Sequence, residues 1–135
     1  MAPRSPKLPL GLVYDTGALI AAEANDRRIW ALHARAMQRG VLPVVPAGCV
    51  VEAWRGGQQP NLARLLDGCE VETLSLEPAK RAGALRRTLP ATIGPVDATV
   101  AETALRRGGA VVTSDRPDIE LLASAAHRRI QLIDI

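Results

Sequence analysis

Residues 11–16 read Gly-Leu-Val-Tyr-Asp-Thr, and residues 110–115 read Ala-Val-Val-Thr-Ser-Asp. Each stretch is a short apolar run typical of a buried strand, and a carboxylate follows it: Asp15 in the first and Asp115 in the second. Ligands of open α/β sheets bind outside the carboxyl ends of the strands. Carboxylates gathered there repel one another unless a cation joins them, and Mg²⁺ and Mn²⁺ prefer such oxygen ligands. The two stretches therefore predict an α/β fold with a metal site at one edge of its sheet.

The rest of the chain alternates between strand-like and helix-like segments, which predicts a mainly parallel sheet with helices on both faces. The expected strands are residues 11–14, 41–45, 71–74, 110–113 and 130–133. The expected helices are residues 18–22, 26–39, 46–54, 61–66, 78–89, 95–107 and 119–126. Residues 1–10 contain three prolines and are predicted to be a flexible arm, followed by a single domain over residues 11–135.

The composition sets few limits on function. The chain has 135 residues and a net charge of +3, and it contains no Phe, so its core must be aliphatic. All but two of its 17 basic residues are Arg, which is compatible with binding to phosphates but does not by itself indicate a nucleic acid. Cys49 and Cys69 are isolated and are expected to be reduced thiols. No stretch resembles a signal peptide or a bilayer span, so we expect a cytoplasmic protein that does not contact membranes.

Three of the candidate site acids could also have an ordinary structural role. Asp15 is expected to be a ligand, although both it and Thr16 suit the cap of the helix that follows. Asp97 begins a helix whose dipole favours an anion, so a ligand and a helix cap are equally compatible with its position. For Asp115, a metal ligand and a turn residue both remain open.

Glu52 is expected to lie in a buried or cleft environment, because its helix, residues 48–54, is apolar almost all round. Asp118 could be a fifth acid of the site or a helix cap. The hydroxyls of Thr113 and Ser114 could hold the carboxylate of Asp115 or a metal-bound water, or could simply form a turn.

The other acids are expected to be outside the site. Those predicted to be solvent-exposed are Glu23, Asp26, Asp67, Glu70, Glu72, Glu77 and Glu120. Glu102 follows Asp97 by about 140° around the helix and is expected to point away from the site. Asp134 is expected to be a tail residue.

The histidines and tryptophans are not expected to take part in chemistry. His33 and His127 are predicted to be surface or half-buried residues, and Trp30 and Trp54 core residues.

Four short motifs resemble the PIN domain, in particular the VapC toxins of bacterial VapBC toxin–antitoxin modules. They are Asp15-Thr16-Gly17 after a strand, Glu52 in a helix that ends Trp54-Arg55-Gly56, Val96-Asp97-Ala98, and Val112-Thr113-Ser114-Asp115. The resemblance implies a three-layer α/β/α PIN-like fold and a Mg²⁺- or Mn²⁺-dependent endoribonuclease, the toxin of a type II toxin–antitoxin system. It also implies three partners: an RNA substrate, a cognate antitoxin protein and a second copy of the chain in a homodimer.

Carried over by position, the resemblance makes Asp15, Glu52, Asp97 and Asp115 the acidic quartet, with Asp118 an occasional extra. Asp15 and Asp97 would hold the metal directly, and Glu52 and Asp115 would do so directly or through water. Family members often carry Ser where Gly17 stands, so a hydroxyl sometimes found near the metal is missing from that position.

Other enzyme classes with a strand-end aspartate fit the sequence less well. A phosphatase of the haloacid dehalogenase type needs a second acid two residues after the first, where Gly17 stands. A receiver-like phosphoacceptor needs a Lys at a late strand end, and the two lysines, Lys7 and Lys80, are not so placed. The remaining alternative is a catalytically silent PIN-fold module that binds RNA or protein.

Overall fold

A computed structural model describes residues 11–135, and the predicted N-terminal arm, residues 1–10, lies outside the described residues. Residues 11–135 form one five-stranded sheet, in which every pairing is parallel and the strand order is β3-β2-β1-β4-β5. The strands are Leu12–Tyr14 (β1), Val44–Pro46 (β2), Glu70–Glu72 (β3), Ala110–Thr113 (β4) and Leu132–Asp134 (β5). The helices are Thr16–Glu23 (α1), Arg27–Gln38 (α2), Ala47–Ala53 (α3), Pro60–Asp67 (α4), Leu76–Leu85 (α5), Pro95–Arg107 (α6) and Arg116–Ala125 (α7).

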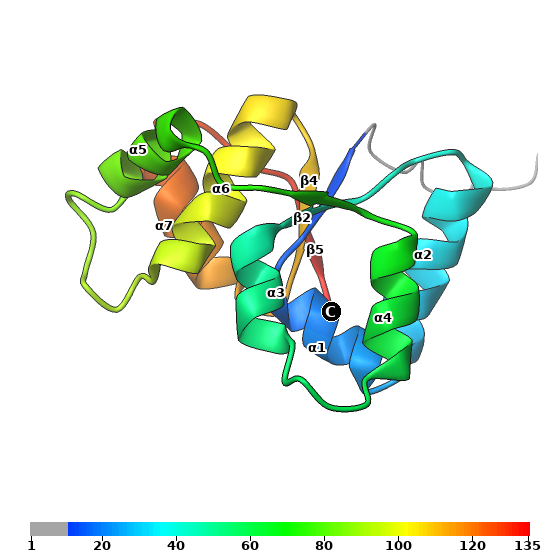
Figure 1. The fold of residues 1–135 in the computed structure, drawn as a ribbon. Helices are drawn as coiled ribbons and strands as arrows, with labels where there is room; N and C mark the ends of the chain where they lie inside the picture. Colours follow the sequence, from blue (N-terminus) through cyan, green and yellow to red (C-terminus); the bar gives the residue numbers. More distant parts are fainter. Residues whose placement is uncertain (1–10) are drawn as a thin grey trace, which may run out of the picture.

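The helices cover the sheet on both sides (Figure 1). Helices α1, α2 and α4 pack together on one face, and α5, α6 and α7 on the other, while α3 contacts both α1 and α6. This arrangement confirms the predicted three-layer α/β/α fold, and the sheet is wholly rather than mainly parallel.

The strand order reverses between β1 and β4, because the chain builds β2 and β3 to one side of β1 and then crosses over to build β4 and β5 on the other. The crevice at such a switch point is the usual ligand site of an open α/β sheet. Asp15 follows β1 and Asp115 follows β4, so the two strand-end acids lie at this point.

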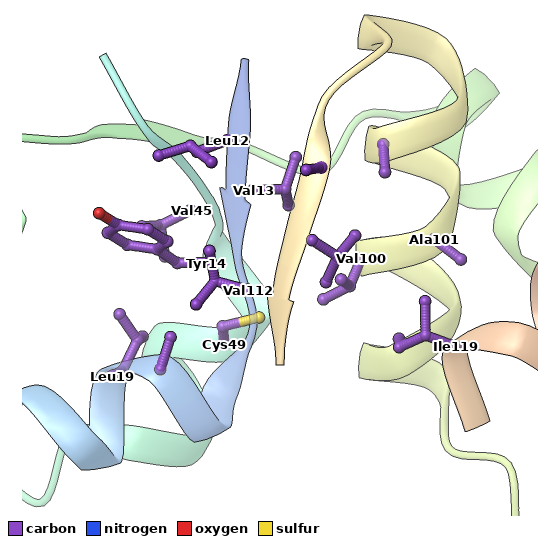
Figure 2. Packing of buried hydrophobic residues seen from close by; sticks show 14 of the residues in the cluster. Leu12, Val13, Tyr14, Leu19, Val45, Cys49, Val100, Ala101, Val112 and Ile119 are labelled. Carbon is purple, nitrogen blue, oxygen red and sulfur yellow. The ribbon is translucent and has the colours of Figure 1, made fainter. Parts of the chain in front are cut away.

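The core is built from the alternating side chains of the central strands. Leu12 and Tyr14 lie on the side of the sheet that α1 covers, whereas Val13 lies on the side of α6, where Val100 packs (Figure 2). The described residues of the core are almost all aliphatic, as the absence of Phe requires. No helix of residues 11–135 is long and apolar enough to cross a membrane.

Two aromatic predictions are wrong. His33 is 6% exposed rather than at the surface or half-buried, and Tyr14 lies beside it, with the Tyr14 hydroxyl and His33 Nδ1 hydrogen-bonded at 2.9 Å. Burial lowers the pKa of His33, which favours the neutral form of the ring. Trp54 is 39% exposed rather than a core residue, because α3 ends at Ala53 and the backbone of Trp54 is extended.

Candidate metal centre

Strand register brings the two strand-end acids together. Tyr14 of β1 lies opposite Val112 of β4, and the N–H of Asp15 donates to the carbonyl of Val112 at 3.2 Å. Asp115 therefore emerges three residues beyond the partner of Tyr14, on the neighbouring strand.

Asp15 is only 3% exposed, and its side chain caps α1, with Oδ1 accepting from the N–H of Ala18 at 3.0 Å. The sequence was compatible with either Asp15 or Thr16 as the cap of this helix, and the structure shows that the cap is Asp15. Burial raises the pKa of Asp15, while hydrogen bonds from the Thr113 side chain and the N–H of Ala18 act in the opposite direction. The two roles considered for Asp15 are compatible, because a capping carboxylate still has lone pairs for a cation.

Thr113 connects the two strand ends. It is fully buried, and its Oγ1 accepts from the N–H of Asp115 at 2.8 Å while its side chain also hydrogen-bonds Asp15. One hydroxyl therefore fixes the backbone of one acid and the carboxylate of the other.

Helices α6 and α7 complete the acidic group. Asp97 lies in the first turn of α6, Asp115 stands at the N-cap position of α7, and Asp118 lies in the first turn of α7. One ligand oxygen from each of these residues lies within 4.8 Å of the other two, the spacing of a group that could hold a metal ion. Asp118, which the sequence left between a fifth site acid and a helix cap, belongs to the group.

The pKa of Asp97 shows how closely the acids gather. It is raised from 3.8 to about 6, first by burial and then by the negative charges of Asp115, Asp118, Asp15 and Glu52 in that order. The pKa of Asp115 is also raised, by burial and then by its hydrogen bond to Asp118. Such shifts mark carboxylates that lack a positive partner.

Glu52 differs from the prediction. Its side chain is exposed, because α3 lies at the end of the sheet and turns residues such as Val51, 78% exposed, to solvent. Glu52 is nevertheless fixed beside the site, since the Thr16 hydroxyl donates to its Oε1 at 2.6 Å and Thr16 directly follows Asp15. No local pattern in the sequence indicates this role of Thr16, apart from its position next to Asp15.

Both cysteines are free thiols, as predicted. Cys49 is a fully buried residue near the start of α3 (Figure 2). Burial raises its pKa to about 12, and the charges of Asp15, Glu52 and Asp97 contribute to the rise. The thiol therefore stays protonated at neutral pH when no metal is bound.

The residues present fit a hard divalent cation. In the part of the chain that the structure describes, the ion pairs include none of the five acids Asp15, Glu52, Asp97, Asp115 and Asp118. By contrast Asp134, at the end of β5, is exposed and pairs with Arg116 at 2.7 Å, so it is not part of the acidic group. Mg²⁺ and Mn²⁺ are bound by such carboxylate sets.

Family comparison agrees with this geometry. Residues 12–123 match the family model of the PIN domain. The chain belongs to the PIN domain family. PIN domains are generally nucleases that use divalent metals, and the acidic group lies within the matched residues.

Solved structures with the same fold include two toxin–antitoxin assemblies. A toxin–antitoxin complex from Klebsiella pneumoniae has 20% identity and a TM-score of 0.56, and the match covers 79% of this chain and 88% of the other. VapBC2 from Rickettsia felis, bound to a DNA fragment from their promoter, has 15% identity and a TM-score of 0.66, with coverage of 93% and 98%. At these identities the likeness concerns the fold. No curated protein sequence matches the chain.

Proposed function

We propose that this PIN domain is a Mg²⁺- or Mn²⁺-dependent endoribonuclease and the VapC-type toxin of a type II toxin–antitoxin system. The observation that carries the proposal is the convergence of five carboxylates at the switch point of the sheet, none of them in an ion pair among the described residues. A group of this kind has little structural value, because mutual repulsion destabilises it until a cation binds.

The proposed roles follow from the positions of the acids. Asp97, Asp115 and Asp118 supply three oxygens that can share one cation, and Asp15 contributes a further carboxylate from the end of β1. Glu52 is more exposed than Asp15, and it would contact the cation either directly or through a water molecule. When bound, the cation supplies Lewis-acid polarisation of the scissile phosphate and acidification of the attacking water.

The chain's own residues orient this chemistry. Thr113 holds Asp15 and the backbone of Asp115 in place, and Thr16 holds Glu52. A carboxylate that is not occupied by the cation can accept the proton of the attacking water. Phosphodiester hydrolysis by this route needs no side-chain nucleophile.

RNA is the proposed substrate, and basic residues near the site are candidates for backbone contacts. Arg86 and Arg87 follow α5 and begin the segment that leads to the N-terminus of α6, where Asp97 lies. The Arg86 Nε donates to the carbonyl of Ile93, which orders this segment. Arg27 and Arg28 begin α2, but Arg28 is already paired with Asp26 at 3.0 Å.

The proposed partners are a cognate antitoxin protein and a second copy of this chain in a homodimer. Two structural neighbours are toxin–antitoxin complexes, which supports an antitoxin partner. A system of this kind acts on cellular RNA, so we place the activity in the cytoplasm.

The experiment is cleavage of structured RNAs by purified protein in Mg²⁺ or Mn²⁺, with EDTA as one control. Asp97→Asn is expected to lower the rate at least about a hundredfold, since even residues that only orient a metal ligand are worth about 10–100-fold. Asp134→Asn is the matched control. It also removes a carboxylate from this edge of the sheet, but that carboxylate is paired with Arg116.

Cleavage that EDTA and Asp97→Asn abolish, and that Asp134→Asn retains, is the expected result. Cleavage that survives EDTA would contradict the metal-dependent mechanism. RNA binding without cleavage, together with no effect of Mn²⁺ on the melting temperature, would favour the catalytically silent binding module.

A further inference from the structure

The C-terminal parts of α5, α6 and α7 line a groove of about 580 Å³. These three helices lie together on one face of the sheet (Figure 1). The groove is lined by residues of the last two turns of α6, whereas Asp97 lies in the first turn of that helix. The groove is therefore separate from the proposed metal centre, and its volume is in the range of ligand-binding clefts, about 300–1,000 Å³.

Half of the groove's lining is apolar. The apolar lining residues come from all three helices and are Ala84, Leu85, Leu105 and Ala126. Ala84 is exposed and the other three are half-buried, so all four reach solvent. Covering this surface with the apolar side chains of a partner removes it from water, which is favourable.

Arginines flank the apolar surface. Arg81, Arg106 and Arg128 also line the groove, and Glu102 is the one acid among its lining residues. Glu102 is 4% exposed, and it pairs with both Arg81 and Arg106 at 3.1 Å. The single acid is therefore already neutralised and does not repel an acidic partner.

Two of these arginines keep donors for such a partner. Arg81 donates from Nε to Glu102, and one terminal nitrogen of Arg128 donates to the carbonyl of Leu105 at 3.2 Å. A guanidinium carries five N–H donors, so each has terminal N–H groups left. Within residues 11–135 Arg128 belongs to none of the ion pairs, so it brings an uncompensated positive charge to the groove.

We propose that this groove binds an acidic amphipathic helix of a partner protein. The apolar side chains of that helix cover the apolar surface of the groove, and its Asp or Glu side chains pair with Arg81 and Arg128. Helices bind such grooves through apolar anchors spaced i, i+3, i+4 and i+7, whereas an extended peptide needs a free strand edge, which helices do not offer. RNA is disfavoured, because the described lining residues include no aromatic side chain on which a base could stack.

The first test is an NMR titration of the isotope-labelled full-length protein with a designed helical peptide of about 20 residues, in which a ridge of Leu is flanked by Glu. The peptide should shift the amide signals of Leu105 and Ala126. It should bind at least about tenfold more tightly than the same peptide with Lys in place of Glu. No binding at about 1 mM peptide, or equal affinity for the two peptides, would overturn the proposal.

The second test places the peptide on the protein with matched variants. Ala84→Glu puts a carboxylate into the groove and should raise the peptide Kd at least about tenfold, while the melting temperature stays that of the wild type because Ala84 is exposed. Ala31→Glu makes the same change at an exposed position of α2, on the other face of the sheet, and should leave the Kd unchanged. Equal losses in the two variants would overturn the site.

A second pair of variants tests the charge. Arg128→Gln should raise the Kd about threefold and reduce its dependence on salt. Arg129→Gln removes the same charge from the next residue, which is exposed but does not line the groove, and should have a smaller effect. An effect of Arg129→Gln as large as that of Arg128→Gln would contradict the pairing with Arg128.

Other occupants of the groove would give different results. A single-stranded RNA that shifts the same amide signals and displaces the peptide would identify a nucleic-acid groove. A wild-type protein that is dimeric by light scattering, together with a monomeric Ala84→Glu variant, would show that a second copy of the chain covers the groove. Either result would overturn the helix partner and leave the proposed metal centre untouched.

Discussion

Helix α6 contributes one acid to each of two acidic groups, and the two acids have opposite surroundings. Asp97 lies in the first turn among four other carboxylates, and none of these is in an ion pair within residues 11–135. Glu102 lies in the middle of the same helix, is 4% exposed, and pairs with Arg81 and Arg106 at 3.1 Å each.

The second group continues across the sheet edge. Arg106 also pairs with Glu72 at 2.8 Å, and Arg107 pairs with Glu70, so helix α6 is tied to β3. Glu70 and Glu72 were expected to be solvent-exposed, yet both are partly buried in this network. Glu102 does point away from the metal centre, as expected. The comparison separates two kinds of acid. Arginines neutralise those of the second group, whereas the repulsion among the unpaired acids is unrelieved, which is why we propose the unpaired acids for the cation.

The largest expected effect on stability comes from removing Glu102, the buried acid of the arginine-paired group. Glu102→Gln leaves Arg81 and Arg106 without their buried partner and should destabilise the protein by about 2 kcal/mol, less than for a fully buried pair because both arginines reach solvent. Thermal unfolding should show a melting temperature about 6 °C lower. Mn²⁺ affinity should be unchanged, and a loss of affinity would show that the two groups are not independent.

Asp97→Asn should stabilise the metal-free protein, whereas Glu102→Gln destabilises it. Removing one charge relieves the repulsion in the metal-free protein, and because Asp97 is half-exposed we expect a gain of about 1 kcal/mol at pH 7. The melting temperature measured in EDTA should rise by about 3 °C, and the rise that Mn²⁺ produces in the wild type should disappear. A lower melting temperature in EDTA would mean that Asp97 stabilises the fold.

The pH dependence should locate this effect. The pKa of Asp97 is raised from 3.8 to about 6, so the folded state binds an extra proton between these values. The stability that this protonation provides is fully present below about pH 4 and is lost as the pH rises through 6. In EDTA, the difference in melting temperature between Asp97→Asn and wild type should therefore be near zero at pH 4 and largest above pH 6.

Comparing the two proteins at each pH removes the contribution of His33, which has the opposite direction. Its lowered pKa costs stability as the pH falls below about 6.5, equally in both proteins. A difference that is the same at pH 4 and pH 7 would contradict the assignment to Asp97.

The smallest effect should come from the exposed pair of Arg116 and Asp134. Both side chains reach solvent, where ion pairs contribute little, so Asp134→Asn should change the free energy of unfolding only slightly. Chemical denaturation with wild type alongside would measure it. A cost as large as that of Glu102→Gln would remove the distinction between buried and exposed pairs.

The sequence predicted those features of the centre that depend on local pattern. Apolar runs ending in Asp15 and Asp115 mark strand ends, and parallel pairing then brings them together. The exposure of Glu52 was not predictable, because α3 buries Cys49 and Ala53 but leaves the apolar Val51 in solvent beside Glu52. The network around Glu102 was missed since its arginines come from α5 and α6 and its other acids from β3, and no local spacing reveals such contacts.

The most direct measurement is anomalous diffraction from crystals soaked in Mn²⁺. The expected result is an anomalous peak within about 2.5 Å of carboxylate oxygens of Asp97, Asp115 or Asp118, close to Asp15. The soak should give no peak beside Glu70, Glu72 and Glu102, whose charges are already neutralised. A fully soaked crystal without a peak among the unpaired acids, or with its peak in the arginine network, would contradict the assignment of the metal centre.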